Sequence, residues 1–192
     1  MVRQDRLRVL AHLGNTEGPV STYSAQGGSY ESITTAWDFP ERMEHSNGVQ
    51  PNDRKHQLKV FGAYALTPEW TLGGNLYIAS GTPRMCRGRY GVDQVALHGS
   101  STYYWCGGKP VPPGSLGRLP WNHQLNLSVD YRPDWADHKL DFNLGIFNVF
   151  NNQVALYYGD SFRSTSNPRV DYGRILDSTA PRYVRFSVAY DF

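Results

Sequence analysis

The chain has 192 residues, of which 14% are aromatic and 19% are charged, with a formal net charge of +2. Gly contributes 19 residues and Pro 12. This composition argues against a helical bundle, a coiled coil or a disordered chain. The sequence lacks an 18-residue apolar run, which argues against transmembrane helices, and its weak charge gives no support for nucleic-acid binding.

Six segments alternate apolar and polar residues with the period of two that predicts β-strands. In chain order they are 6–13, 56–66, 70–80, 121–131, 140–150 and 182–192. In the fourth segment Leu125, Leu127 and Val129 alternate with Asn122, Gln124 and Asn126. We therefore expect the first set to face outward, with nothing of the chain over it, and the second set to face the concave side of a curved sheet.

The connections between these segments alternate in length. Short turns at 67–69 and 132–138 contain Pro, whereas the connections 14–55, 81–120 and 151–182 are long. Long loops are unusual in a compact domain but typical of one side of an outer-membrane barrel. The pattern predicts an all-β fold, an antiparallel transmembrane β-barrel portion of about six strands with long extracellular loops and short periplasmic turns. A soluble β-sandwich binding module is the alternative.

Aromatic residues gather at the ends of the predicted strands. This set comprises Trp70, Trp121, Tyr131, Tyr190 and Phe192. Membrane barrels carry aromatic girdles at both interfaces, and the positions at strand ends favour that interpretation. Aromatic residues are also good strand formers in general, which is the simpler explanation.

Several short motifs together resemble one family. Residues 182–192, which alternate and end in Phe192, resemble the last strand of Gram-negative outer-membrane barrels. Residues 147–152, Phe-Asn-Val-Phe-Asn-Asn, resemble a penultimate-strand segment of TonB-dependent receptors. Residues 14–18, 51–59 and 80–83 are similar to the Oar-like subgroup of those receptors.

The resemblance implies a barrel of about 22 strands with an N-terminal plug that imports a scarce solute using energy from the TonB complex. Compared with that pattern, we expect residues 1–192 to be a C-terminal segment of the barrel with no plug domain, so that TonB would act only through missing N-terminal parts. We expect location in the Gram-negative outer membrane, among its lipids, with no cofactor and no enzyme activity. A structural or adhesive outer-membrane protein that displays loops without transport is the rival function.

The family also implies that the terminal Phe192 is part of the signal read by the barrel-assembly machinery. Six strands leave two open sheet edges, whose unsatisfied backbone groups are costly in lipid. We therefore expect that this chain alone is not a working transporter.

Two cysteines and an aromatic trio lie in the second long connection. From the residues alone, Cys86 and Cys106 fit one disulfide or two free thiols equally well. The extracellular location implied by the resemblance favours the disulfide. Tyr103, Tyr104 and Trp105 are predicted to contact the unknown solute, because exposed loop aromatics often mark binding; alternatively, the trio packs the loop against itself.

No metal or catalytic site is expected. Cys86, His98 and Cys106 lack a fourth zinc ligand and the usual spacing. The mixed cluster Asp53, Arg54, Lys55 and His56 is better explained as a charged loop end, because adjacent side chains on a strand diverge.

Overall fold

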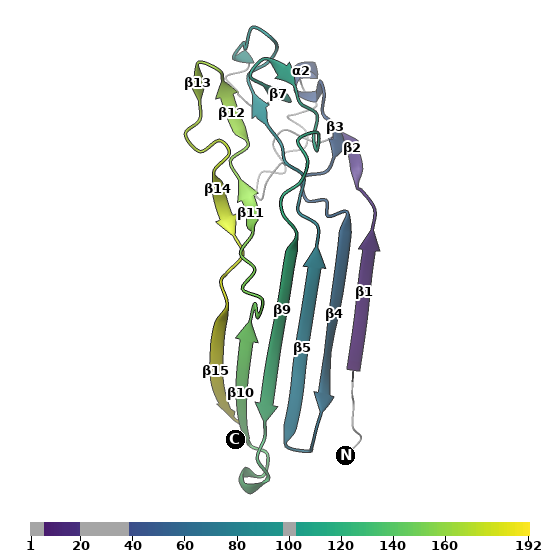
Figure 1. The fold of residues 1–192 in the computed structure, drawn as a ribbon, viewed down its shortest axis with the longest axis vertical. Helices are drawn as coiled ribbons and strands as arrows, with labels where there is room; N and C mark the ends of the chain where they lie inside the picture. Colours follow the sequence, from purple (N-terminus) through teal and green to yellow (C-terminus); the bar gives the residue numbers. More distant parts are fainter. Residues whose placement is uncertain (1–5, 20–38, 98–102) are drawn as a thin grey trace.

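The computed structural model describes residues 6–19, 39–97 and 103–192. Six long strands form one sheet in the order β1-β4-β5-β9-β10-β15, and all neighbours are antiparallel (Figure 1). Their bounds are β1 Arg6–Leu13, β4 His56–Ala65, β5 Trp70–Ala79, β9 Asn122–Tyr131, β10 Leu140–Phe147 and β15 Tyr183–Tyr190. The sequence predicted all six, with small differences at their ends.

Shorter elements occupy the long connections at one end of the sheet (Figure 1). They are β2 Glu17–Pro19, α2 Pro40–Met43, β3 Asn47–Val49, β6 Arg87–Gly88, β7 Trp105–Cys106, β8 Lys109–Pro110, β11 Ala155–Tyr158, β12 Ser161–Ser164, β13 Asn167–Pro168 and β14 Ile175–Ser178. The alternation did not predict them, because segments this short contain too few residues to show a period. The opposite end has the two short turns, one of which contains the 3₁₀-helix η2, Asp134–Ala136. No helix in the described ranges is long and apolar enough to cross a membrane.

The register divides the sheet into two chemically different faces, because residues directly opposite one another share a face. Leu127 lies opposite Gly74 and Ile146, whereas Ser128 lies opposite Gly73 and Gly145. The apolar face carries Leu7, Val9, Leu58, Val60, Tyr64, Trp70, Leu72, Leu76, Ile78, Leu125, Leu127, Val129, Tyr131, Phe142, Leu144, Ile146, Val184, Phe186, Val188 and Tyr190.

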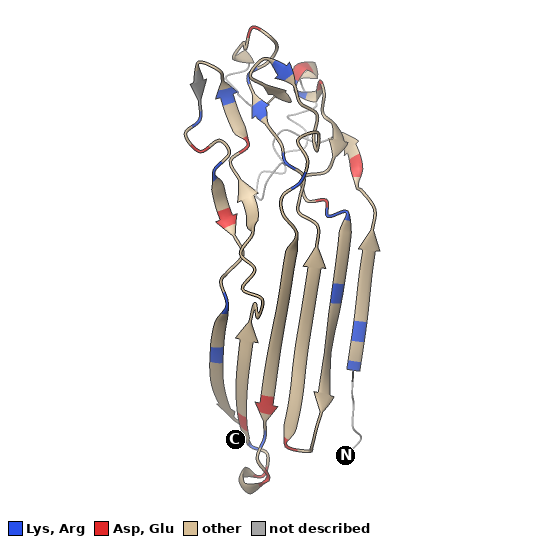
Figure 2. Cartoon of the chain, in the orientation of Figure 1, with Lys and Arg blue, Asp and Glu red and all other residues tan. Residues whose placement is uncertain are grey.

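The other face, which we call the polar face, carries every Lys, Arg, Asp and Glu of the six long strands. These residues are Arg6, Arg8, Lys59, Asp130, Asp141 and Arg185. Figure 2 shows how few charges lie along the sheet compared with its ends and loops. The predicted separation of Leu125, Leu127 and Val129 from Asn122, Gln124 and Asn126 is confirmed.

The six-stranded sheet is a single layer, with no second described sheet over it (Figure 1). Leu127 is 44% exposed and Phe186 63% exposed. The buried hydrophobic residues include Met85, Cys86 and Tyr158, which lie in the loops. This is not the two-layer arrangement of a β-sandwich, whose core lies between its sheets.

The sheet is open at both edges among the described residues. β15 pairs along its whole length with β10, from Leu140 opposite Tyr190 to Phe147 opposite Tyr183, and with no other described strand. The predicted pairing of the last segment with a single antiparallel neighbour is thus confirmed. β1 forms the other edge and pairs with β4.

Candidate functional site

Aromatic side chains lie on the apolar face at the turn end of the sheet. The Trp70 ring stacks on Tyr131 with centroids 4.4 Å apart, and Tyr131 in turn stacks on Phe142 at 6.2 Å. Tyr190 meets Phe192 edge to face at 5.4 Å. Four of the five predicted girdle residues, Trp70, Tyr131, Tyr190 and Phe192, therefore gather at this end.

The fifth, Trp121, lies at the loop end of the sheet. Its ring stacks between His56, at 5.6 Å, and His123, at 6.2 Å. Ten residues of extended chain separate Trp121 from Tyr131, which corresponds to about 33 Å along the strand and about 25 Å for a strand tilted by about 40°. That height matches the apolar band of outer-membrane barrels, although the girdle role itself stays a prediction.

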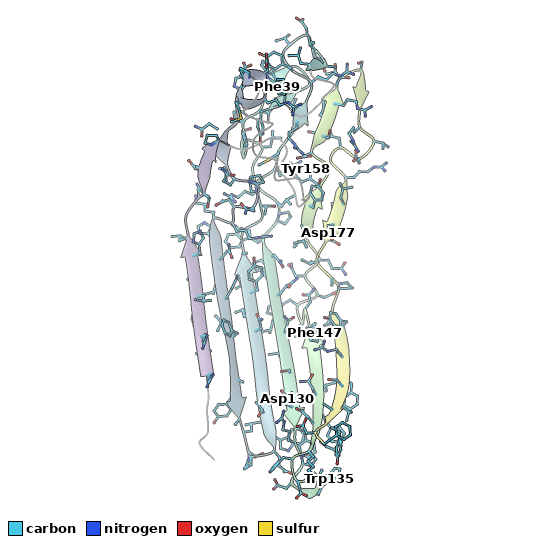
Figure 3. The ribbon with its side chains drawn as sticks, turned by 180° about the vertical axis from the view of Figure 1, so that it is seen from behind. Phe39, Asp130, Trp135, Phe147, Tyr158 and Asp177 are labelled. Atoms are coloured by element: carbon cyan, nitrogen blue, oxygen red, sulfur yellow. A yellow bond between two sulfur atoms is a disulfide. The ribbon has the colours of Figure 1, made fainter. Side chains whose placement is uncertain are left out.

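The polar face carries side-chain pairs that bridge neighbouring strands. Asn143 donates to the carboxylate of Asp130, which is labelled in Figure 3 toward the turn end of the sheet; the hydrogen bond joins β10 to β9 and is 2.6 Å long. Arg132, at the turn end, donates to Asp141 at 2.7 Å and 3.0 Å, and this contact raises the pKa of the Arg132 guanidinium. A neighbouring hollow of about 330 Å³ includes Asn126 and Arg185 in its lining.

A partly buried ion pair joins the first long connection to the second. Arg118 donates to the Asp53 carboxylate, which is 1% exposed, and to the Gly81 carbonyl oxygen at 3.2 Å. The second Asp53 oxygen accepts the Thr16 backbone N–H at 2.7 Å. Arg54 donates to the Ser80 carbonyl oxygen at 2.8 Å. The cluster at 53–56 is thus a structural anchor at the loop end of β4 and β5.

The second and third long connections are also tied together. The Arg87 guanidinium forms an ion pair with Asp160, 2.9 Å away, in which the Asp160 side chain is 3% exposed. The Tyr158 hydroxyl donates to the Met85 carbonyl oxygen and accepts the Met85 backbone N–H. Burial raises the pKa of Tyr158 to about 12. These contacts hold the second and third long connections, 81–120 and 151–182, together as one packed unit, which we call the loop unit.

The two cysteines are joined by a disulfide within this unit. Cys86 and Cys106 have Cα atoms 5.7 Å apart, inside the usual range for a bridge. The Cys86 side chain is fully buried, and the Cys106 sulfur lies 3.7 Å from the Tyr172 hydroxyl of the third connection. The disulfide therefore braces the second connection where it meets the third.

The aromatic trio is not the exposed patch that its sequence indicated. Tyr103 and Tyr104 are completely buried, and burial raises the pKa of the Tyr104 hydroxyl. The Tyr103 hydroxyl donates to the Leu97 carbonyl oxygen at 2.7 Å, and its ring meets Tyr90. Trp105 is half-buried against His45 and Tyr90. The expectation of exposure is wrong, because these rings fill the core of the loop unit.

A metal site finds no geometric support in the described part of the chain. No three His, Cys, Asp or Glu side chains there gather in a way that could hold an ion. Cys86 and Cys106 are bonded to each other. His98 lies outside the described residues.

The motif at 147–152 has a clear structural role that the sequence did not reveal. Asn148 and Asn151 have φ angles of 52° and 51°, a left-handed conformation that Asn tolerates better than most residues. Asn148 ends β10, and its backbone N–H donates to the Asn126 side chain at 2.9 Å. Its side chain donates to the Ala180 carbonyl oxygen at 2.8 Å, and Asn152 accepts from the His123 backbone N–H. The motif therefore joins β9, β10 and the start of β15.

Comparison with known proteins gives one informative similarity. Over 128 residues, 64% of this chain, the sequence is 32% identical to the TonB-dependent transporter Oar of Myxococcus xanthus. The chain spans 11% of the length of that relative. No family model matches the sequence, and no solved structure matches it. The similarity supports a relationship to TonB-dependent receptors through a small part of one.

Proposed function

We propose that residues 1–192 form a C-terminal segment of the outer-membrane β-barrel of a TonB-dependent receptor, which binds and imports a solute without chemical change. One observation carries the proposal. All charged residues of the six long strands lie on one face, and the opposite face is apolar, exposed and bounded at both ends by aromatic rings. Lipid on the apolar side and water on the polar side would satisfy both faces.

The open edges support a place within a larger barrel. β1 and β15 each leave one side without a strand partner among the described residues, and lipid offers no hydrogen bonds to such backbone groups. Further strands on both sides would satisfy them. The partial similarity to Oar is consistent with a longer protein that supplies those strands.

The end of β15 fits the proposed contact with the barrel-assembly machinery. Phe192 is fully exposed beside Tyr190, at the free edge of the sheet. A free edge next to an aromatic end can be captured by strand pairing before a barrel closes. The contact with TonB belongs to segments outside residues 1–192 in this proposal.

Import is tested in the native host by deleting the gene and measuring which solutes the cells remove from the medium. The deletion strain should lose proton-motive-force-dependent removal of at least one solute, and the full-length gene should restore it. If both strains remove every solute equally while the protein is assembled in the outer membrane, the import function is contradicted. Loss of surface attachment without any uptake defect would favour adhesion instead.

A further inference from the structure

A hollow of about 330 Å³ opens on the polar face across β5, β9, β10 and β15. Its polar-face side chains are Asn75, Asn126, Ser128, Asn143, Phe147 and Arg185. Gly73 and Gly145 lie directly opposite Ser128 on the two neighbouring strands. Because neither residue has a side chain, the floor of the hollow is low at this point. A Cβ on Gly73 would lie 2.4 Å from the Ser128 hydroxyl oxygen, so the floor has no room for a side chain there.

Arg185 lies at the edge of this hollow, and among the described residues it has no acidic partner. Its guanidinium carbon lies 5.0 Å from the centroid of the Phe147 ring, which is itself stacked on Tyr183 at 4.7 Å. The Phe147 ring can pack closely over position 145 because that residue is Gly; a Cβ there would lie 2.9 Å from the ring. The cation–π contact with Phe147 holds the guanidinium beside the hollow, and the Tyr183 ring in turn supports Phe147.

The acids of the polar face are already engaged elsewhere. Asp130 accepts from Asn143, and Asp141 accepts from Arg132. Within the described ranges, Arg185 makes no ion pair with either. Its hydrogen-bond donors therefore remain available toward the hollow.

We infer that this hollow is a carboxylate-binding site. A guanidinium binds a carboxylate through two parallel N–H···O hydrogen bonds, which match the planar geometry of both groups. Ser128 adds a hydroxyl donor, and Asn75 adds an amide donor beside it. The Asn126 side-chain oxygen already accepts from the Asn148 backbone, which leaves its amide nitrogen as a further donor. The lining thus offers many donors around one fixed cation.

The carboxylate has two potential sources with the same chemistry. One is a small solute that enters from water, and the other is an Asp or Glu side chain of a polypeptide seated on the polar face. The inference goes beyond the proposed function, because it requires only that the polar face meets water or another chain. A protein that imports nothing can still bind a carboxylate here.

The test uses the full-length protein in detergent and the arginine reagent phenylglyoxal, with adducts quantified by mass spectrometry. Glutarate should slow modification of Arg185 by about threefold or more relative to sodium chloride of equal ionic strength. Arg163, which is exposed on β12 outside the hollow, serves as the internal control and should react at an unchanged rate. The neutral diamide of glutarate should give no protection.

A resident polypeptide carboxylate gives a different result. Arg185 should then resist phenylglyoxal before any addition, and in the R185K variant a carbodiimide should join the new amine to an Asp or Glu. Protection by glutarate identifies a solute site, and the cross-link identifies a polypeptide partner. A result with neither protection nor cross-link overturns the inference, and it leaves the separate uptake experiment unaffected.

Discussion

Asn148 donates a side-chain hydrogen bond to the carbonyl oxygen of Ala180, 2.8 Å away. The hydrogen bond joins the two ends of the third long connection where it leaves the sheet, a place that we call the neck. The same side chain accepts the Asn152 backbone N–H at 3.0 Å. Asn148 is 4% exposed, so these hydrogen bonds are shielded from water. One residue thus fixes both sides of the connection at the end of β10.

Replacement of Asn148 separates its two roles. Asn148→Gly keeps the left-handed backbone accessible but removes the side-chain hydrogen bonds, which should destabilise the neck by about 1–3 kcal/mol. Asn148→Ala should cost about 1 kcal/mol more, because Ala disfavours the positive φ. Thermal unfolding of the full-length protein measures both. Equal melting temperatures for Asn148→Ala and wild type would contradict this role.

Removal of Arg118 should loosen the first long connection. Arg118→Met leaves the Asp53 carboxylate buried without its cation, at a cost of about 3–5 kcal/mol. Hydrogen exchange at the Thr16 amide, which donates to Asp53, should accelerate. The control is Arg132→Met, which breaks a pair whose Arg132 side chain is 55% exposed, and its effect should stay below about 1 kcal/mol. Comparable effects of the two substitutions would show that the Asp53–Arg118 pair is not an anchor.

Loss of the disulfide should destabilise the loop unit. Cys86 and Cys106 are separated by 20 residues, and release of a loop of that size costs about 3 kcal/mol. The double substitution to Ser should therefore increase cleavage of the second connection in limited proteolysis. Wild-type protein treated with a reductant should behave like the variant. Unchanged proteolysis in both samples would mean that packing alone holds the loop.

High pH should separate the second and third connections. The folded pKa of Tyr158, about 12, lies above the ordinary tyrosine value of 10.0 because burial disfavours the phenolate. The folded form therefore holds its proton more tightly, and this stabilisation is complete below pH 10 and is lost as the pH rises from 10 to 12. Tyr158→Phe should remove this part of the alkaline transition in thermal melts. An identical pH profile in wild type and variant would contradict the assignment.

The sheet was predictable from the sequence, whereas the loop unit was not. Alternation alone placed Leu125 and Gln124 on opposite faces, because side-chain direction in a strand depends only on position. The loop core depends instead on distant pairs such as Tyr158 with Met85, which are 73 residues apart and leave no periodic signal. For the same reason the burial of Tyr103 could not be read from its neighbours in the chain.

The hollow at Arg185 could not be predicted from the sequence either. Gly73, Ser128 and Gly145 meet only through the strand register, and each appears unremarkable alone. By contrast, the sequence resemblance pointed to the segment that contains Asn148, although it did not reveal the left-handed backbone that requires a residue of this kind. Strand register creates the hollow, whereas the conformation at Asn148 is set by its own backbone and its side-chain hydrogen bonds.

In the proposed barrel the apolar face meets lipid and the polar face does not. Leu125→Arg and Gln124→Arg place the same charge at adjacent positions of β9, on the apolar and the polar face respectively. An arginine facing lipid near the midplane costs about 2–4 kcal/mol, whereas one facing water costs little. The decisive measurement is the amount of each full-length variant folded in the outer membrane, read from its heat-modifiable band. We predict a strong loss for Leu125→Arg and wild-type assembly for Gln124→Arg; equal assembly of the two variants, or the reverse order, would show that the apolar face does not meet lipid.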